Sequence, residues 1–275
     1  MGAALGAELR RRGHTVLWAS SGRGAATNRR AAEAGLRDVV ATGELARRSG
    51  VILSVCPPHA ARAVAQSVAG FEGVFVDANA VSPETSRAMG ATIESRGGRY
   101  VDAGIIGSAP RSAGTTRLYL SGPDAQLVAD LFEGTAVDAR LVSGLPGAAS
   151  AVKMAYAAWT KGTAALLLAV RAVARAEGVE ETLLDEWRES LPDLLERSRR
   201  AAAAARAKGW RWVGEMEEIA STFAADGLPD GFHHAAAEVF AAGSTRSSGS
   251  AALDTDAEAA LVADANVERD ARGRA

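Results

Sequence analysis

The first half of the chain alternates short apolar runs with amphipathic stretches of helical length. Continuous apolar runs such as VILSV (51–55) and GVFVDA (73–78) are typical of strands that are buried on both faces of a sheet. Strands that alternate with helices of about 10–15 residues indicate βαβ units around a parallel sheet. The expected strands cover 14–20, 36–42, 51–58, 73–83, 99–110, 116–122 and 139–145, and the expected helices begin near 1, 31, 59, 83 and 123.

The pattern changes after Gly147, where no further strand is expected. Long alanine-rich helices are predicted over 148–176, about 181–206, about 209–225 and about 229–241. The sequence therefore predicts an α/β domain over 1–143 and an all-α domain over 144–242. Residues 243–275 are small, polar and charged, which predicts a mostly disordered tail with one short helix at 256–265.

The helix over 148–176 carries the strongest candidate chemistry. It is apolar on most sides, so we expect it to be buried between other elements. Its polar side chains gather in one sector of the helix: Lys153, Tyr156, Thr160 and Thr163, flanked by Ser150 and Lys161. A lysine close to a helix start that opens with Gly144 and Gly147 is a candidate catalytic group. The alternative is an ordinary lysine whose stem covers apolar neighbours while its amine reaches water.

Composition excludes several classes of protein. The formal net charge is −2, so no global positive field attracts nucleic acid. Cys56 is the single cysteine, which excludes an internal disulfide, and the four histidines show no metal-binding spacing, so no metal is expected. No apolar run reaches 18 residues and no signal-peptide pattern opens the sequence, so we expect neither a membrane span nor export, but a cytoplasmic protein.

An α/β half followed by a glycine-opened helix with a lysine resembles the β-hydroxyacid dehydrogenase and 6-phosphogluconate dehydrogenase superfamily. The motif G-x-x-G-x-G-x-x-x-K-x-x-x-N reads here Gly144, Gly147, Ala149, Lys153 and Ala157. The stretches RWVGEMEEIASTF (211–223) and GFHHAAAEVF (231–240) resemble the branch with a phosphogluconate dehydrogenase-like C-terminal domain of the DUF1932 type. The resemblance covers about 1–242.

The resemblance implies a Rossmann-like NAD(P)-binding domain, a helical substrate and dimerisation domain, and Lys153 as proton donor or acceptor. Tyr156 and Lys161 are the reserve candidates, and Tyr156 shares the polar stripe and can also move a proton. The His, Asn and Glu that accompany the lysine in 6-phosphogluconate dehydrogenases are replaced here by Tyr156, Ala157 and Thr160. Oxidative decarboxylation of 6-phosphogluconate is therefore not expected, and a homodimer is.

The substrate loop of the family, D-A-P-V-S-G-G, reads here from Asp102 to Ser108. The serine that holds a substrate carboxylate in the family aligns with Ile106, whereas Gly107 is kept and Ser108 offers a hydroxyl one position later. A ketone or an imine is therefore as plausible a substrate as a hydroxy acid. The residues expected to bind the substrate are Gly107, Ser108, Thr160, Lys161 and His233.

The expected cofactor-binding motif is only partly present at the start of the sequence. Met1 and Gly2 match the last two residues of the G-x-G-x-M-G fingerprint, whose last part opens a helix that holds a pyrophosphate. The first strand and two glycines do not precede them in this sequence. Either the assigned start lies about ten residues too late or the chain has lost this strand and cofactor binding with it.

The remaining cofactor contacts are expected at the ends of later strands. Ser20, Ser21 and Arg23 stand where NAD enzymes place an acidic residue, and small hydroxyls with an arginine suit the 2′-phosphate of NADP. Cys56, Pro57 and Asn79 should border the nicotinamide side of the crevice.

Two classes of function remain open at this point. The first is an oxidoreductase that moves a hydride between NADP and a small hydroxy, keto or imine substrate, with imine reduction as one variant. The second is a catalytically inactive homodimer with a regulatory or interaction role, which the late start, Ala149, Ala157 and Ile106 favour.

Overall fold

The computed structural model describes residues 1–245 and divides the chain into two compact units. The first unit covers Met1–Met154 and the second begins at Ala155. The division falls inside a long helix, whereas the sequence predicts a boundary at Gly144. The predicted tail over 243–275, with its short helix, lies almost entirely outside the described residues.

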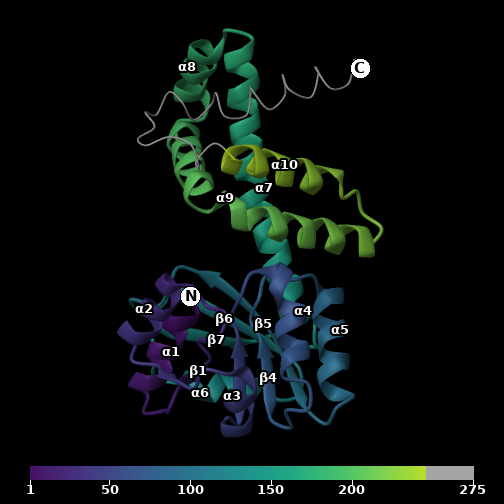
Figure 1. Ribbon diagram of the computed structural model, residues 1–275. Coiled ribbons are helices and arrows are strands. Elements are labelled where there is room, and N and C mark those ends of the chain that lie inside the picture. Colours follow the sequence, from purple (N-terminus) through teal and green to yellow (C-terminus); the bar gives the residue numbers. More distant parts are fainter. Residues whose placement is uncertain (246–275) are drawn as a thin grey trace. The chain divides into compact units, whose positions relative to one another are not determined.

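The first unit is built on a five-stranded sheet with the order β3-β4-β5-β6-β7 (Figure 1). Two short strands, β1 and β2, form a separate parallel pair. Among the described residues, neither β1 nor β2 pairs with a strand of the five-stranded sheet. The strands are β1 Leu17–Trp18, β2 Arg37–Asp38, β3 Val51–Ser54, β4 Val74–Asp77, β5 Arg99–Gly107, β6 Thr116–Ser121 and β7 Val137–Leu141.

The five-stranded sheet is mixed: it has the parallel pairs of the expected Rossmann-like sheet and one antiparallel pair. β6 runs antiparallel to β5, with Asp102 opposite Ser121 and Gly107 opposite Thr116. The segment 108–115 that joins them contains no helix, and antiparallel neighbours need no helical crossover. The pairs β3–β4, β4–β5 and β6–β7 are parallel.

Helices cover both faces of this sheet, and each face has its own apolar cluster. On one face Leu5 of α1 and Val128 of α6 pack with Val76. On the other face Met89 of α5 packs with Phe75, which alternates with Val76 along β4. The helices are α1 Gly2–Arg11, α2 Ala25–Glu33, α3 Thr42–Arg48, α4 Pro58–Ser67, α5 Pro83–Glu94 and α6 Ala125–Leu131.

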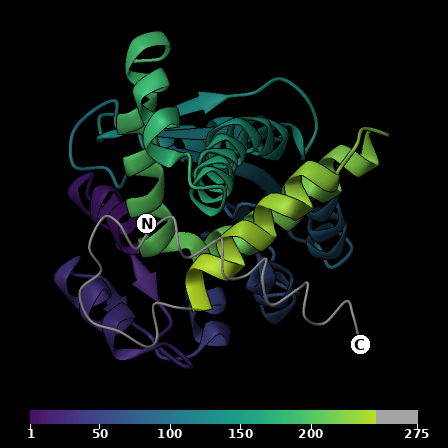
Figure 2. The same ribbon diagram turned by 90° about the horizontal axis from the view of Figure 1, so that it is seen from above.

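Up to residue 245, where the description of the structure ends, the second unit has helices and no strand, as expected. α7 runs from Ala148 to Ala176, so it begins in the first unit and continues into the second. It is followed by α8 Glu180–Ser190, α9 Leu194–Ala225 and α10 Gly231–Thr245. α9 and α10 pack side by side as a helical hairpin (Figures 1 and 2). No helix among residues 1–245 is long and apolar enough to cross a membrane.

The predicted helix break near Gly209 is wrong. α9 runs through this glycine without interruption, and the break comes earlier, between α8 and α9 at 191–193. Pro192 lies in that break, and proline interrupts a helix far more strongly than glycine does, by about 3 against about 1 kcal/mol relative to alanine.

α7 is not buried on all sides within the described chain. In the second unit Trp159 is 68% exposed and Val173 is 58% exposed. The exposed apolar side chains recur in steps of three, seven and four, which places them along one side of the helix. We call this set the α7 stripe: Tyr156, Trp159, Leu166, Val170 and Val173.

Candidate active site

The start of α7 is held by one buried carboxylate, that of Asp102 on β5. The backbone N–H groups of Gly147 and Ser150 each donate to its Oδ2 atom at 2.9 Å, and the Ser150 hydroxyl donates to Oδ1 at 2.5 Å. A carboxylate is favoured at a helix N-terminus because the unpaired N–H groups and the helix dipole are positive there.

Two serines complete the surroundings of Asp102. The hydroxyl of Ser86, on α5, donates to Oδ1 at 2.8 Å, and that of Ser121, on β6, donates to Oδ2 at 3.0 Å. The Ser121 oxygen also accepts the backbone N–H of Ala149 at 3.0 Å. Asp102, Ser86, Ser121 and Ser150 are all fully buried, so these hydrogen bonds are shielded from water.

Gly104 brings Lys153 against the same strand. A Cβ atom on Gly104 would lie 2.8 Å from the carbonyl oxygen of Ala149 and 2.9 Å from the Cβ atom of Lys153. Only a residue without a side chain permits this approach of helix to strand. Lys153 is half-buried, and the sequence alone did not show that its neighbour would be Gly104.

Tyr156 and Thr160 lie further along α7, in the second unit. Tyr156 is 47% exposed and belongs to the α7 stripe. The Thr160 hydroxyl is exposed and donates to the Tyr156 carbonyl oxygen at 3.1 Å. Their predicted roles in proton transfer and substrate binding stay predictions.

Lys161, expected to bind the substrate, forms an ion pair with Glu215 of α9. Both side chains are largely buried, and the Lys161 amine lies 6.0 Å from the centre of the Trp212 ring. The pair therefore joins two helices of the second unit. No local pattern in the sequence marks Glu215 as the partner of Lys161, because the two residues lie 54 positions apart.

His233, also expected to contact the substrate, is buried at the start of α10. Its ring makes edge contacts with Phe223 and Phe232. Burial, and then the nearby His234, lower the pKa of His233, so the ring is neutral at pH 7. Its Nδ1 atom has no hydrogen-bond partner within the described residues.

Gly107 and Ser108 lie at the end of β5. Gly107 adopts a φ of 113°, and the carbonyl of Thr115 occupies the space that a side chain would need. Ser108 is exposed, and its carbonyl oxygen accepts the Thr116 hydroxyl at 2.5 Å. Ile106 is buried, so the position that carries serine in the family points no polar group to solvent.

Four of the predicted cofactor residues lie at the start of α1 or directly after β3 and β4: Gly2, Cys56, Pro57 and Asn79. Gly2 lies against Val55, directly after β3, and no side chain caps the start of α1 within the described part of the chain. Pro57 is the N-cap residue of α4. This edge therefore offers an open helix N-terminus at the carboxyl ends of parallel strands, where open α/β sheets bind ligands.

Asn79 clamps two strand ends together. Its amide donates to the Ser54 hydroxyl at 3.0 Å and to the Asp77 carboxylate, and its oxygen accepts the Cys56 N–H at 2.5 Å. The side chain is 3% exposed. These hydrogen bonds fix the ends of β3 and β4, where a cofactor is expected to bind. They also engage the Asn79 side chain and the Cys56 N–H, which were expected to contact the cofactor.

Cys56 is half-buried at the same edge. Burial raises the pKa of its thiol, while the Ser54 hydroxyl and the more distant charge of Arg23 act in the opposite direction. Arg23 thus lies within electrostatic range of the end of β3.

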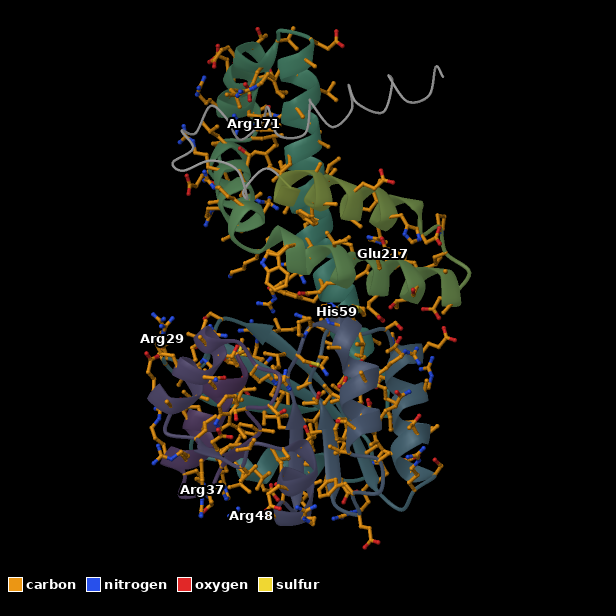
Figure 3. All side chains as sticks on the ribbon, in the orientation of Figure 1. Arg29, Arg37, Arg48, His59, Arg171 and Glu217 are labelled. Carbon is orange, nitrogen blue, oxygen red and sulfur yellow. The ribbon has the colours of Figure 1, made fainter. Side chains whose placement is uncertain are left out.

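Asp38, at the end of β2, is a neighbour of the Ser20–Arg23 loop. Its position in the sequence does not show that it lies there. Hydrogen bonds from the Ser20 hydroxyl and from the backbone N–H of Val40 lower the pKa of Asp38, so it is charged at neutral pH. Ser21 binds the Val40 carbonyl through its own N–H. An acidic group therefore stands next to Ser20 after all, contributed by the neighbouring strand. Arg29 of α2 and Arg37 of β2 are both exposed (Figure 3).

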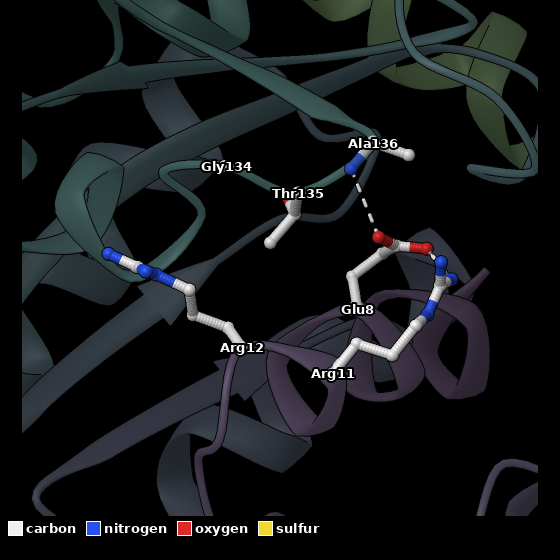
Figure 4. Close-up of a pocket in the computed structure, with 6 residues that line it drawn as sticks. All are labelled: Glu8, Arg11, Arg12, Gly134, Thr135 and Ala136. Atoms are coloured by element: carbon white, nitrogen blue, oxygen red, sulfur yellow. Dashed lines mark hydrogen bonds and ion pairs between the residues drawn. The ribbon is translucent and has the colours of Figure 1, made fainter.

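A cavity at the opposite end of α1 is lined by Glu8, Arg11, Arg12 and 134–136 (Figure 4). Glu8 is buried, pairs with Arg11 and accepts the Ala136 N–H at 3.0 Å. These contacts tie the last turns of α1 to the chain before β7. The cavity lies at the carboxyl end of α1, where the helix dipole disfavours an anion.

Comparison with protein families identifies the class of protein. The NAD-binding domain of 6-phosphogluconate dehydrogenase matches residues 1–137, and the domain of unknown function DUF1932 matches residues 174–243. The chain belongs to the 6-phosphogluconate dehydrogenase-like superfamily, in the branch that carries a DUF1932 domain.

One curated protein is similar to part of the chain. An uncharacterized 28.5 kDa protein of Methanothermus fervidus is 30% identical over 165 residues, which are 60% of this chain and 63% of that protein. The chain therefore spans less than two thirds of the length of this curated relative.

Two solved structures share the fold. A conserved hypothetical protein of Sinorhizobium meliloti is 26% identical, with coverage of 95% and 92% of the two chains and a TM-score of 0.70. The 3-hydroxyisobutyrate dehydrogenase of Mycobacterium tuberculosis is 19% identical, with 95% of each chain covered and a TM-score of 0.66. At that identity, the second likeness concerns the fold alone.

Proposed function

We propose that the protein is an NADP-dependent oxidoreductase that moves a hydride between the nicotinamide and a small hydroxy, keto or imine substrate. Lys153 is the proton donor or acceptor. The observation that carries this proposal is the contact between Gly104 and Lys153, which holds a lysine against a strand of the NAD-binding domain.

The residues at the cofactor edge fit a dinucleotide. The start of α1 offers backbone N–H groups next to Gly2, which suit a pyrophosphate. Arg23 and the hydroxyls of Ser20 and Ser21 suit a 2′-phosphate, and Asp38 opposes it through its negative charge. We therefore propose NADP as cofactor, with a preference that Asp38 restrains.

Lys153 supplies the proton that the hydride transfer requires. The nicotinamide carries the hydride. In the direction of reduction, the substrate carbon gains the hydride and the Lys153 ammonium gives one proton to the carbonyl oxygen or the imine nitrogen, which yields an alcohol or an amine. In the reverse direction the neutral amine of Lys153 accepts that proton. Proton transfer by a positioned side chain contributes roughly 10²–10⁴-fold to rate.

The test is a comparison of variants with a panel of ketones, cyclic imines and hydroxy acids. Lys153→Met should lower the turnover of the accepted substrate by roughly 10²-fold or more, with NADPH binding unchanged. Lys208→Met, which changes an exposed lysine of α9, should retain full turnover. Near-normal turnover of Lys153→Met contradicts the proposed role, and acceptance of imines but not hydroxy acids makes the protein an imine reductase.

A second candidate is a homodimer that lacks activity and acts through its surface. The α7 stripe supports its dimeric state, because monomers rarely leave such an apolar set of side chains in water. We propose that a second copy of the chain covers this stripe. A dimer agrees with both candidates, so the NADPH titration described in the Discussion distinguishes them.

A further inference from the structure

We propose that Asp102 and Gly104 form a two-point seat on β5 that positions Lys153. Asp102 fixes where α7 begins, and Gly104 sets how closely Lys153 approaches the strand. Both are positioning residues, since neither carries out the proton transfer. The inference rests on the proposed function only for the role of Lys153, and its test below is independent of turnover.

The first point of the seat is the cluster around Asp102. Its carboxylate accepts five hydrogen bonds, and their donors come from α5, from β6 and from the first turn of α7. Ser121 adds a further bond, to the N–H of Ala149. A helix held by three of its first N–H groups cannot shift along its axis or rotate without breaking buried, charge-assisted bonds.

The second point lies two residues along β5. Residues i and i+2 of a strand face the same side, so Asp102 and Gly104 both face α7. Ala149 and Lys153 are four residues apart, so they lie on one face of the helix, and this face rests on Gly104. The position of Lys153 is thus set by two contacts between α7 and β5. Asp102 binds the start of the helix, and Gly104 lies against Lys153 itself.

The contacts of Asp102 and Gly104 with α7 are more than the start of a stable helix requires. A helix start needs a cap, and one serine or aspartate supplies it. Here the start of α7 has more support than a cap. The Asp102 carboxylate and three serines form one hydrogen-bonded cluster, and Gly104 leaves no room for a side chain between β5 and the helix. This is the arrangement needed when one side chain must be held within a fraction of an ångström.

The test uses the scarcity of lysine in this chain. Lys153, Lys161 and Lys208 are its three lysines, so acetylation by N-hydroxysuccinimidyl acetate followed by mass spectrometry reports each amine separately. Rates are measured from pH 7 to pH 10 on the full chain. The exposed Lys208 serves as the reference within each molecule.

Gly104→Ala is the decisive variant, because its new Cβ atom must push α7 away from β5. The ratio of Lys153 to Lys208 acetylation should change by roughly threefold or more, with a displaced pH profile, because small displacements have large effects on reactivity. Gly43→Ala is the matched control: its Cβ atom would meet only the end of the Arg47 side chain, at 3.9 Å, and the ratio should stay unchanged. An unchanged ratio in Gly104→Ala overturns the proposal.

Asp102→Asn tests the other point by amide hydrogen exchange. Exchange over 147–153 should become faster, while exchange in α4 stays as in the unaltered chain. If that variant does not fold, Ser150→Ala removes only one hydroxyl from the cluster and is measured instead. Unaltered exchange over 147–153 contradicts the anchoring role of Asp102.

The two hypotheses can fail separately. A changed Lys153 ratio together with no NADPH binding leaves the seat standing and refutes the proposed function. Turnover that is lost in Lys153→Met, together with an unchanged ratio in Gly104→Ala, supports the function and refutes the seat.

Discussion

The Asp102 carboxylate accepts both the backbone N–H of Ser150, at 2.9 Å, and the Ser150 hydroxyl, at 2.5 Å. One fully buried side chain of the α/β unit thereby holds the first turn of the helix that continues into the second unit. Charged hydrogen bonds of this kind are individually worth about 1.5–3 kcal/mol. The stability of the first unit should therefore depend strongly on this one residue.

Asp102→Ala should lower the free energy of unfolding by roughly 3 kcal/mol or more, because several buried donors lose their acceptor at once. Urea unfolding followed by circular dichroism measures the change. Asp138→Ala is the control, since it removes only an exposed pair with Arg140 and should cost about 1 kcal/mol or less. Equal effects of the two substitutions contradict the structural role of Asp102.

The Lys161–Glu215 pair predicts a rescue. Lys161→Met should destabilise the helical unit by roughly 3–5 kcal/mol, because it leaves a buried carboxylate without its partner. The double variant Lys161→Met with Glu215→Leu should recover most of the loss, because neither charge is then buried alone. Thermal unfolding of the single and double variants measures this, and an additive loss in the double variant contradicts it.

Cys56 predicts a slow reaction with thiol reagents. Burial raises the pKa of the Cys56 thiol, so the thiolate fraction at pH 7.5 is below that of an ordinary cysteine and rises only in more alkaline solution. Alkylation by iodoacetamide should be roughly tenfold slower in the folded chain than in urea, and its rate should still be increasing at pH 9. A folded-state rate equal to the rate in urea at pH 7.5 is incompatible with this environment.

The α7 stripe predicts self-association. Trp159→Glu places a charge within the stripe and should convert the dimer to a monomer in light scattering at micromolar concentration. Trp210→Glu is the matched control, because Trp210 of α9 is similarly exposed, at 59%, but lies outside the stripe. A monomeric unaltered chain, or a dimer that persists in Trp159→Glu, contradicts the proposed contact.

Asp38 predicts how the cofactor preference can be changed. Asp38→Asn removes a negative charge beside Ser20, so NADPH should bind roughly tenfold more tightly while NADH binding changes little. Fluorescence titrations with both dinucleotides measure the ratio. Glu33→Gln, an exposed change in α2, serves as the control. If the ratio of NADPH affinity to NADH affinity stays unchanged in Asp38→Asn, Asp38 is not part of the cofactor site.

Much of the fold followed from the sequence because apolar periodicity is local. The runs at 51–55 and 73–78 became β3 and β4, and the helix over 148–176 has the predicted ends. The direction of β6 and the start of α2 at Ala25 did not follow, because the first depends on a connection and the second on a cap at Gly24, without any apolar signal.

The site was less accessible from the sequence than the fold. Lys153 was found because a lysine on an apolar helix is conspicuous, whereas its neighbour Gly104 is one of 29 glycines. Lys161 and Asn79 carried the right polar groups, but the structure shows these groups engaged with Glu215 and with Ser54. Which polar side chains are already paired is a property of tertiary contacts, and spacing does not reveal it.

The central claim, a working NADP-dependent oxidoreductase, is tested most directly by titrating the chain with NADPH and with NADH. Trp18 of β1 lies two residues before Ser20, so quenching of its fluorescence should report binding, with the unfolding temperature as a second measure. The account predicts saturable NADPH binding with a clear thermal shift, and weaker binding of NADH. A folded chain that binds neither dinucleotide contradicts it.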